Sequence, residues 1–355
     1  MKSKFLCLAV CLILIMVSLA GCSKAPATPE GQSEGQAETQ PEGQPEETFV
    51  MRIAANLPKG SYEVDIHEEF KRCLEEKTGS RIKVEIYPAG QLGAPPAVIE
   101  GIQSGTIQSY LAPIAFLSGV APGTQILDLP GFFETTEQAY DILNNTDAAK
   151  TLDEDMAKRG FTPLGYLVMD YRSIIAPFPV ESLNDLKGKR FRVMTTPPQQ
   201  LEFEAFGGSG VPVDPGETYT ALQQGMVDGV CSGVHFFYSM KLHEVGKYYS
   251  NTRHAAFVSP LIVSTSWLDS LPDDLREAVV DTAKEVMPWG YELTKEYEGR
   301  ALNAMIDEGL IVVEASPEFL EEIWEASKVV HDKILADNPE WEQLYNDIKA
   351  EIEKR

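Results

Sequence analysis

Hydrophobic and polar residues alternate over 82–86, where the sequence is Ile-Lys-Val-Glu-Ile. A period of two residues predicts a strand with one buried face. The apolar run 49–56 predicts a buried strand before it, and between the two strands apolar residues recur with a helical period as far as Gly79. Because strand, helix and strand in this order are typical of a parallel βαβ unit, the pattern favours an α/β fold.

A second pattern occurs twice in the chain. Residues 102–107 (Ile-Gln-Ser-Gly-Thr-Ile) match residues 222–227 (Leu-Gln-Gln-Gly-Met-Val) in character, position by position. Each predicts a helix end, a glycine cap and the start of a buried strand. The two copies indicate two lobes of related build with a ligand between them, although so common a junction can also recur by chance.

Longer patterns are expected to connect the lobes. Extended runs at 166–177 and 256–265 predict strands that cross from one lobe to the other and back. Apolar residues recur with a helical period over 273–308, a segment that would span roughly 54 Å as one helix. Pro288 is expected to bend this helix in its middle.

The first 21 residues are expected to lie outside the fold. Two lysines precede an apolar run over 5–19, which is too short and ends too sharply for a membrane-spanning helix. The run ends in Leu-Ala-Gly-Cys, a lipobox that resembles those of bacterial lipoproteins and implies lipid on Cys22; a plain signal peptide is the alternative. Residues 22–48 then form the anchor and a disordered tether, since 23–48 contain no large apolar side chain.

The net charge narrows the classes of partner. The formal charge is −24, and cleavage of the lysine-bearing leader would make it two units more negative. No basic stripe is present to neutralise phosphates, so nucleic-acid binding is excluded. Because the protein as a whole repels anions, an anionic ligand would have to be captured by a local group of cations.

The cysteines indicate free thiols rather than a disulfide framework. Of the five cysteines, only Cys73 and Cys231 lie beyond the predicted leader and anchor. An exported protein could pair them in a disulfide, but each lies in its own apolar pattern. Two buried free thiols are therefore favoured.

The segment 188–193 carries the strongest candidate for ligand binding. Its sequence Gly-Lys-Arg-Phe-Arg-Val alternates apolar residues with Arg190 and Arg192, and the prolines at 197 and 198 cannot continue the strand. Arg192 therefore lies near the carboxyl end of a strand, where open α/β sheets bind ligands. Its guanidinium fits a carboxylate with two parallel hydrogen bonds. The alternative is a surface arginine paired with an acidic neighbour.

The same region resembles a known family. Lys-Gly-Lys-Arg-Phe-Arg-Val, the Ala-Phe-Gly-Gly turn, Val-Pro-Val at 211–213 and the segment 217–229 resemble the solute-binding proteins of TRAP transporters, the C4-dicarboxylate-binding (DctP) family. The turn Tyr-Pro-Ala-Gly-Gln-Leu-Gly at 87–93 extends the resemblance, which covers essentially all of 49–355. The resemblance implies a periplasmic-binding-protein fold, two α/β lobes around a cleft with a long kinked spine helix, and a ligand carboxylate held by Arg192.

Five further residues are predicted to lie in the cleft. The resemblance suggests Arg172 as a second cation, and it places Ser232 where many relatives have an asparagine that contacts the carboxylate. Asn56 ends the first strand and could reach the ligand, although a purely structural turn residue is almost equally expected. Pro113, where relatives have polar contacts, indicates an apolar wall, and His235 follows Ser232 into the same region.

An enzyme is not indicated. Cys231 and His235 could suggest a nucleophile and a base, but no orienting partner accompanies them. The histidines show no metal-ligand spacing, no phosphate-binding Gly-x-x-x-x-Gly-Lys loop is present, and no cofactor is expected.

The sequence therefore predicts a lipid-anchored, extracytoplasmic binding protein that captures a small organic acid and delivers it to a TRAP-type permease in the membrane. A ligand-sensing module of the same fold that signals to a partner is the alternative. The predicted lobes comprise residues 49–169 plus 258–298 and residues 170–257 plus 299–355.

Overall fold

The computed structural model describes residues 47–355, which belong to one compact unit, Glu46–Arg355. The predicted signal peptide (1–21), the lipid-bearing Cys22 and nearly all of the tether predicted for 22–48 lie outside the described residues, so they stay predictions.

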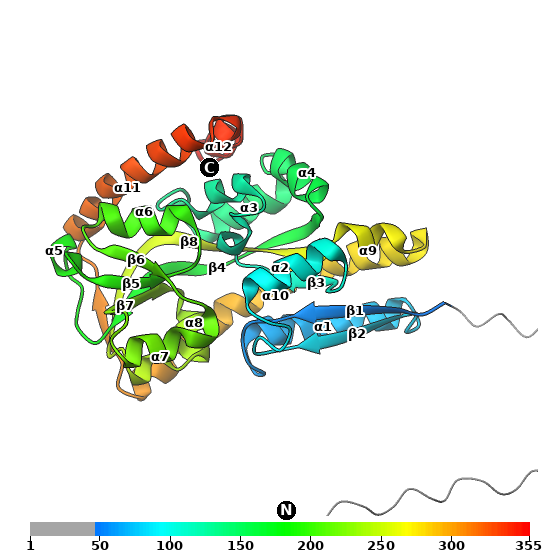
Figure 1. Cartoon of the computed structure of the whole chain (residues 1–355), viewed down its shortest axis with the longest axis horizontal. Coiled ribbons are helices and arrows are strands. Elements are labelled where there is room, and N and C mark those ends of the chain that lie inside the picture. The colour runs from blue at the N-terminus through cyan, green and yellow to red at the C-terminus, as the bar shows by residue number, and fades with distance from the viewer. Residues whose placement is uncertain (1–46) are drawn as a thin grey trace, which may run out of the picture. The chain divides into compact units, whose positions relative to one another are not determined.

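A single mixed sheet organises the described residues (Figure 1). Its strands lie in the order β2-β1-β3-β8-β4-β7-β5-β6, and β9 pairs with β8. β1 is parallel to both β2 and β3, which confirms the predicted βαβ unit. The strands are β1 (Phe49–Ala54), β2 (Ile82–Tyr87), β3 (Ser109–Leu111), β4 (Phe161–Ala176), β5 (Arg190–Val193), β6 (Ser209–Pro212), β7 (Gly229–Ser232), β8 (Tyr248–Ser264) and β9 (Ile311–Glu314).

The sheet consists of two related halves. One half has the order β2-β1-β3-β8 and the other has the order β6-β5-β7-β4. In each half the first three strands are parallel, and the fourth is antiparallel to the third. The repeated glycine junction marks the same point in both halves, since Gly105 (φ 76°) precedes β3 and Gly225 (φ 68°) precedes β7. The interpretation of the repeat as two related lobes is therefore confirmed.

The long strands β4 and β8 belong to both halves. They pair antiparallel from Phe161 opposite Ser264 to Ala176 opposite Tyr248. The register shifts at three places, which lie between residues 163 and 166, 168 and 171, and 172 and 174. The middle shift lies beside the predicted lobe boundary. The lobe limits themselves, 49–169 plus 258–298 and 170–257 plus 299–355, stay a prediction.

Helices cover both faces of the sheet; in Figure 1, α11 and α12 lie above it and α7 and α8 below it. Residues of α1, α8 and α10 form one hydrophobic core with the sheet, and residues of α2, α3, α4 and α12 form another. The helices are α1 (Tyr62–Lys77), α2 (Pro95–Ser104), α3 (Thr136–Asn145), α4 (Lys150–Lys158), α5 (Leu183–Leu186), α6 (Pro197–Ala205), α7 (Thr218–Gln223), α8 (Val234–Ser239), α9 (Thr265–Ser270), α10 (Asp273–Asp307), α11 (Pro317–Asp337) and α12 (Glu342–Ile352).

The long helix α10 confirms the predicted spine. It is continuous through Pro288 and contacts β4, α1 and α8. Its buried residues recur along one side, which is why a segment with an internal proline stays helical: packing on the sheet outweighs the lost backbone hydrogen bond. The bend expected at Pro288 stays a prediction.

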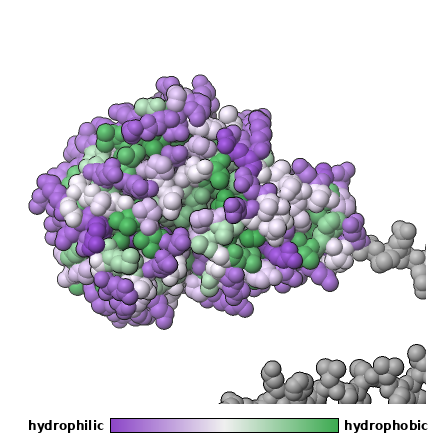
Figure 2. All heavy atoms as spheres, viewed as in Figure 1, coloured by the Kyte–Doolittle hydropathy of each residue, from purple (hydrophilic) through white to green (hydrophobic). Residues whose placement is uncertain are grey.

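Hydrophilic side chains dominate the rim of the face in Figure 2, and hydrophobic ones gather nearer its middle. Both Cys73 and Cys231 are buried free thiols, as expected. Within residues 47–355, no helix combines the length and the apolar character that crossing a membrane would require.

Arg172 on β4 is completely buried, and its charge is neutralised inside the protein. Nη1 donates to Oε2 of Glu202 on α6 at 2.7 Å. Nη2 donates to the main-chain oxygen of Asp128 at 3.1 Å and lies 3.5 Å from that residue's Oδ1. Burial raises the pKa of both carboxyl groups, that of Glu202 to about 7. The guanidinium therefore ties β4 to α6 and to the 3₁₀ turn η2 (Pro122–Asp128).

Arg172→Ala is expected to lower the free energy of unfolding by about 3–5 kcal/mol, because it leaves buried carboxyl groups without their partner. Urea denaturation followed by circular dichroism measures this loss. Arg72→Ala is the matched control: its exposed side chain pairs with Glu69 and Glu76 on α1, and because such solvent-exposed ion pairs contribute little, its removal should cost far less. Equal losses for the two variants would contradict the structural role of Arg172.

Candidate functional site

Four strands end at one pocket, which has about 480 Å³ of space not filled by atoms. Asn56 follows β1, Pro113 follows β3, Arg192 lies near the end of β5 and Ser232 ends β7. Each half of the sheet therefore contributes two strand ends, the usual place for a ligand in an α/β sheet. The remaining lining residues are Leu57, Tyr62, Glu63, Leu111, Phe116, Met169, Asp170, Met194, Pro215, Gly233, His235, Phe236 and Phe257.

Arg192 is a buried cation without a buried anion. The residue is 1% exposed, and its Nε donates to the main-chain oxygen of Val213 at 3.0 Å. The guanidinium carbon lies 4.9 Å from the ring centroid of Phe236. Within residues 47–355 the side chain has no ion pair, and the two terminal nitrogens have no hydrogen bond. Burial lowers the pKa of Arg192 to about 10, so the group still carries its charge at neutral pH.

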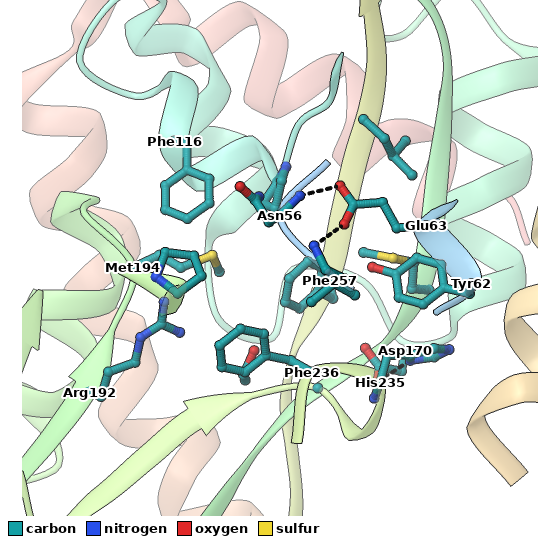
Figure 3. Close-up of a pocket in the computed structure, with 17 residues that line it drawn as sticks. Asn56, Tyr62, Glu63, Phe116, Asp170, Arg192, Met194, His235, Phe236 and Phe257 are labelled. Carbon is teal, nitrogen blue, oxygen red and sulfur yellow. Dashed lines mark hydrogen bonds and ion pairs between the residues drawn. The ribbon is translucent and has the colours of Figure 1, made fainter. Parts of the chain in front are cut away.

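The neighbouring cation on β5 shows the contrast. Arg190 is half-exposed and pairs with Asp228, with Nε 3.1 Å from Oδ2. The alternative of a surface arginine paired with an acidic neighbour therefore describes Arg190, whereas Arg192 faces the pocket (Figure 3).

The loop after β1 is shaped by a carboxyl group that the sequence reading missed. Oε1 of Glu63 accepts the amide of Asn56 at 3.2 Å, and Oε2 accepts the amide of Leu57 at 2.8 Å. Burial raises the pKa of Glu63 to about 7, although these two amide hydrogen bonds lower it. Asn56 also donates from Nδ2 to the hydroxyl of Tyr110. No periodic pattern marks Glu63, because its role depends on the way the loop folds back over the first turn of α1.

A second buried pair also lines the pocket. Nδ1 of His235 is 2.7 Å from Oδ2 of Asp170, and Nε2 is 2.9 Å from the main-chain oxygen of Thr294 on α10. Because both partners are acceptors, both ring nitrogens must donate, and His235 is therefore a cation paired with Asp170. Burial lowers the pKa of His235, but Asp170 outweighs burial and the net shift is upward. Gly233 allows this packing, since a Cβ there would lie 2.1 Å from Oδ1 of Asp170.

Much of the remaining wall is apolar. Pro113 lines the pocket as predicted, and the rings of Phe116, Phe236 and Phe257 surround the space between Arg192 and Glu63 (Figure 3). These rings come from separate elements, the 3₁₀ turn η1 (Ile114–Leu117), α8 and β8.

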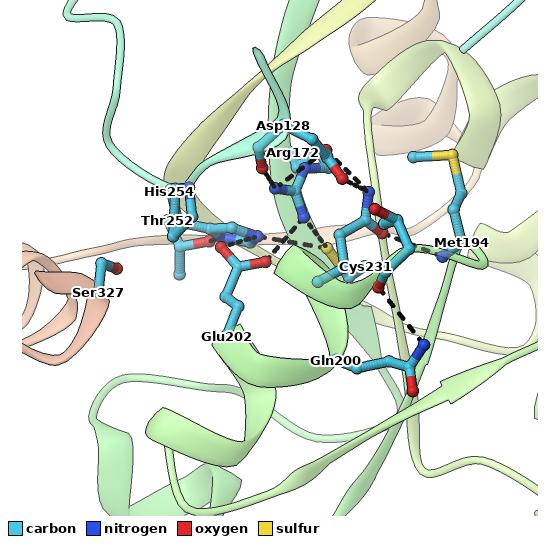
Figure 4. A network of polar contacts seen from close by, with 12 residues as sticks. Asp128, Arg172, Met194, Gln200, Glu202, Cys231, Thr252, His254 and Ser327 are labelled. Atoms are coloured by element: carbon cyan, nitrogen blue, oxygen red, sulfur yellow. Dashed lines mark hydrogen bonds and ion pairs between the residues drawn. The ribbon is translucent and has the colours of Figure 1, made fainter. Parts of the chain in front are cut away.

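The structure brings Asn56, Pro113, Arg192, Ser232 and His235 to the pocket, but not Arg172. Figure 4 shows the guanidinium of Arg172 enclosed with Asp128, Glu202 and Cys231. Its cationic side chain faces anionic groups of the protein itself. The prediction for Arg172 came from the family resemblance. The two residues that bind it, Glu202 and Asp128, lie 30 and 44 residues away in the sequence.

Cys231 and His235 do not form a catalytic pair. Sγ of Cys231 lies 3.3 Å from Nε2 of His254 instead, and burial raises the pKa of this thiol to about 12. A thiol with that pKa is not a nucleophile at neutral pH. Cys231, His254 and Glu202 could together hold a metal ion. However, Nη1 of Arg172 lies 2.7 Å from Glu202 and 3.7 Å from Cys231. The guanidinium therefore already places a positive charge beside these two potential metal ligands.

Comparisons with known proteins agree with this fold. Residues 53–338 match the family model DctP, described as bacterial extracellular solute-binding protein, family 7. The 2,3-diketo-L-gulonate-binding periplasmic protein YiaO of Escherichia coli is 26% identical over 247 residues, which cover 69% of this chain and 75% of that protein.

Two crystal structures of TRAP periplasmic solute-binding proteins share the fold, each at 27% identity. The protein from Sulfitobacter sp. NAS-14.1, with bound β-D-galacturonate, has a TM-score of 0.82, and the match covers 85% of this chain and 99% of that one. The protein from Desulfovibrio salexigens, with bound orotic acid, has a TM-score of 0.81, and the match covers 86% of this chain and 100% of that one. The chain belongs to the DctP family of bacterial extracellular solute-binding proteins, the solute-binding proteins of TRAP transporters.

Proposed function

We propose that this protein captures a small organic acid in the pocket and holds a carboxylate of that acid on Arg192. The observation that carries the proposal is the buried guanidinium whose terminal nitrogens have no partner among residues 47–355. A buried charge is costly unless it is paired and hydrogen-bonded. A ligand carboxylate would supply both the missing anion and two parallel hydrogen bonds. Galacturonate and orotic acid, the ligands of the two related structures, each carry one carboxylate.

The protein then delivers the acid to a TRAP-type permease in the membrane, and lipid on Cys22 holds it on the extracytoplasmic side. Family membership and the lipobox at 19–22 support this role. Deletion of the gene should abolish uptake of the acid. A module that only senses its ligand would leave uptake unchanged.

Binding without chemical conversion is the proposed activity. The pocket holds no nucleophile with a lowered pKa, and its His235 and Asp170 are already bound to each other. Mass spectrometry of the ligand after long incubation with the protein should recover it unchanged.

Arg192→Ala should weaken binding of the acid by roughly two to three and a half decades, because the ligand carboxylate would be buried without its partner. Arg192→Lys should recover only part of the loss, since an ammonium group cannot make the two-pronged contact. Isothermal titration calorimetry measures both affinities.

Arg190→Ala is the matched control for this experiment. Arg190 lies on the same strand, but its side chain is half-exposed and pairs with Asp228. Its removal should leave the affinity within about twofold, since Arg190 does not line the pocket and its charge is screened by solvent. If a folded Arg192→Ala protein binds as tightly as Arg190→Ala, the carboxylate site lies elsewhere.

The affinity for the acid should be higher at pH 6 than at pH 8. Burial raises the pKa of Glu63 to about 7, so this carboxyl group is mainly neutral at pH 6 and mainly charged at pH 8. A charged Glu63 repels an anion in the same pocket, whereas Arg192, with a pKa of about 10, stays cationic throughout. Calorimetry at both pH values should show a difference that Glu63→Gln removes. The same pH dependence in Glu63→Gln would assign it to another group.

A further inference from the structure

The pocket offers one free cation to a ligand. Among its lining residues Arg192 is the only arginine or lysine, and the cationic ring of His235 has both nitrogens occupied by Asp170 and Thr294. The far end of the pocket holds two carboxyl groups, those of Glu63 and Asp170. A dicarboxylate bound at Arg192 would bring its second carboxylate towards these acids, where like charges repel. The pocket therefore favours a ligand with a single carboxylate.

The pocket offers few free hydrogen-bond partners for the hydroxyl groups of a ligand. Both oxygens of Glu63 already accept backbone amides, Oδ2 of Asp170 binds His235, and the amide nitrogen of Asn56 donates to Tyr110. Each hydroxyl of a uronate would require its own partner in a buried pocket. Apart from the terminal nitrogens of Arg192, the side-chain groups without a partner within residues 47–355 are Oδ1 of Asp170, the hydroxyls of Tyr62 and Ser232 and the side-chain oxygen of Asn56.

Rings and sulfur atoms form the rest of the wall. Phe116, Phe236 and Phe257 come from three different elements and surround the space in front of Arg192 (Figure 3). Met169 and Met194 also line it, and thioethers make favourable contacts with aromatic rings. Aromatic pairs gain energy beyond the area that they bury, so such a wall favours a flat ring over a hydroxylated, non-planar sugar.

We infer that the ligand is an aromatic monocarboxylate, with its carboxylate on Arg192 and its ring among Phe116, Phe236 and Phe257. This inference rests on the proposed function and names the substrate class of the same site. It separates this protein from relatives that hold uronates and places it beside the relative that holds orotic acid, a planar ring with one carboxylate.

Calorimetry on the purified protein, unfolded and refolded to remove any copurified ligand, tests the inference. The probes are benzoate, indole-3-acetate and orotate as aromatic acids, glucuronate and galacturonate as uronates, and succinate as a dicarboxylate. At least one aromatic acid should bind about tenfold more tightly than every uronate and than succinate.

The outcomes separate this inference from the proposed function. If succinate or a uronate binds most tightly and Arg192→Ala abolishes that binding, the carboxylate site stands and the aromatic class is wrong. If none of the six acids binds more tightly to the protein than to Arg192→Ala, the proposed function fails as well.

A substitution in the wall provides the second test. Phe116→Leu keeps an apolar side chain but removes the ring, and it should weaken binding of the preferred aromatic acid about two- to twelvefold. Phe178→Leu is the control, because Phe178 lies outside the pocket and packs under Lys189; it should leave the affinity unchanged. An unchanged affinity in Phe116→Leu, or an equal loss in both variants, would overturn the stacking role.

Discussion

The desolvated guanidinium of Arg192 is the constraint on which the site depends. Its Nε is held by the oxygen of Val213 and its face by the ring of Phe236, so its direction is fixed before any ligand arrives. Removing a cation from water is costly, and burial is the cause that lowers the pKa of this group to about 10. A protein with a net charge of −24 repels anions at long range, so specific capture depends on this local positive charge.

Of the two buried arginines, Arg172 is bound within the fold, and Arg192 is the one proposed to bind the ligand. Arg172 on β4 has Glu202 and Asp128 as partners, and its charge is balanced within the protein. Arg192 on β5 has no such partner among residues 47–355, and its terminal nitrogens face the pocket. The difference lies in the partners, because both side chains are equally buried. Burial alone therefore does not distinguish an arginine that stabilises the fold from one that is available to a ligand.

Local patterns predicted the parts of the structure that depend on local rules. The alternation over 82–86 predicted β2, and the repeated glycine junction predicted the two related halves, since a glycine with positive φ ends a helix in each. Arg192 could be placed because the alternation of the strand and the prolines that follow it are close together in sequence. The pairing of Arg172 with Glu202 and the hydrogen bonds of Asp170 and His235 could not, because packing between distant elements creates them. Glu63 was missed for a related reason: it accepts a hydrogen bond from Asn56, seven residues earlier, and this bond forms only once the loop has folded.

A crystal structure of the protein with its bound acid tests the account most directly. The account predicts two carboxylate oxygens at about 2.7–2.9 Å from the terminal nitrogens of Arg192, with Arg172 still paired to Glu202. A ligand whose carboxylate lies away from Arg192, or one that binds Arg172 after that pair has opened, would contradict it.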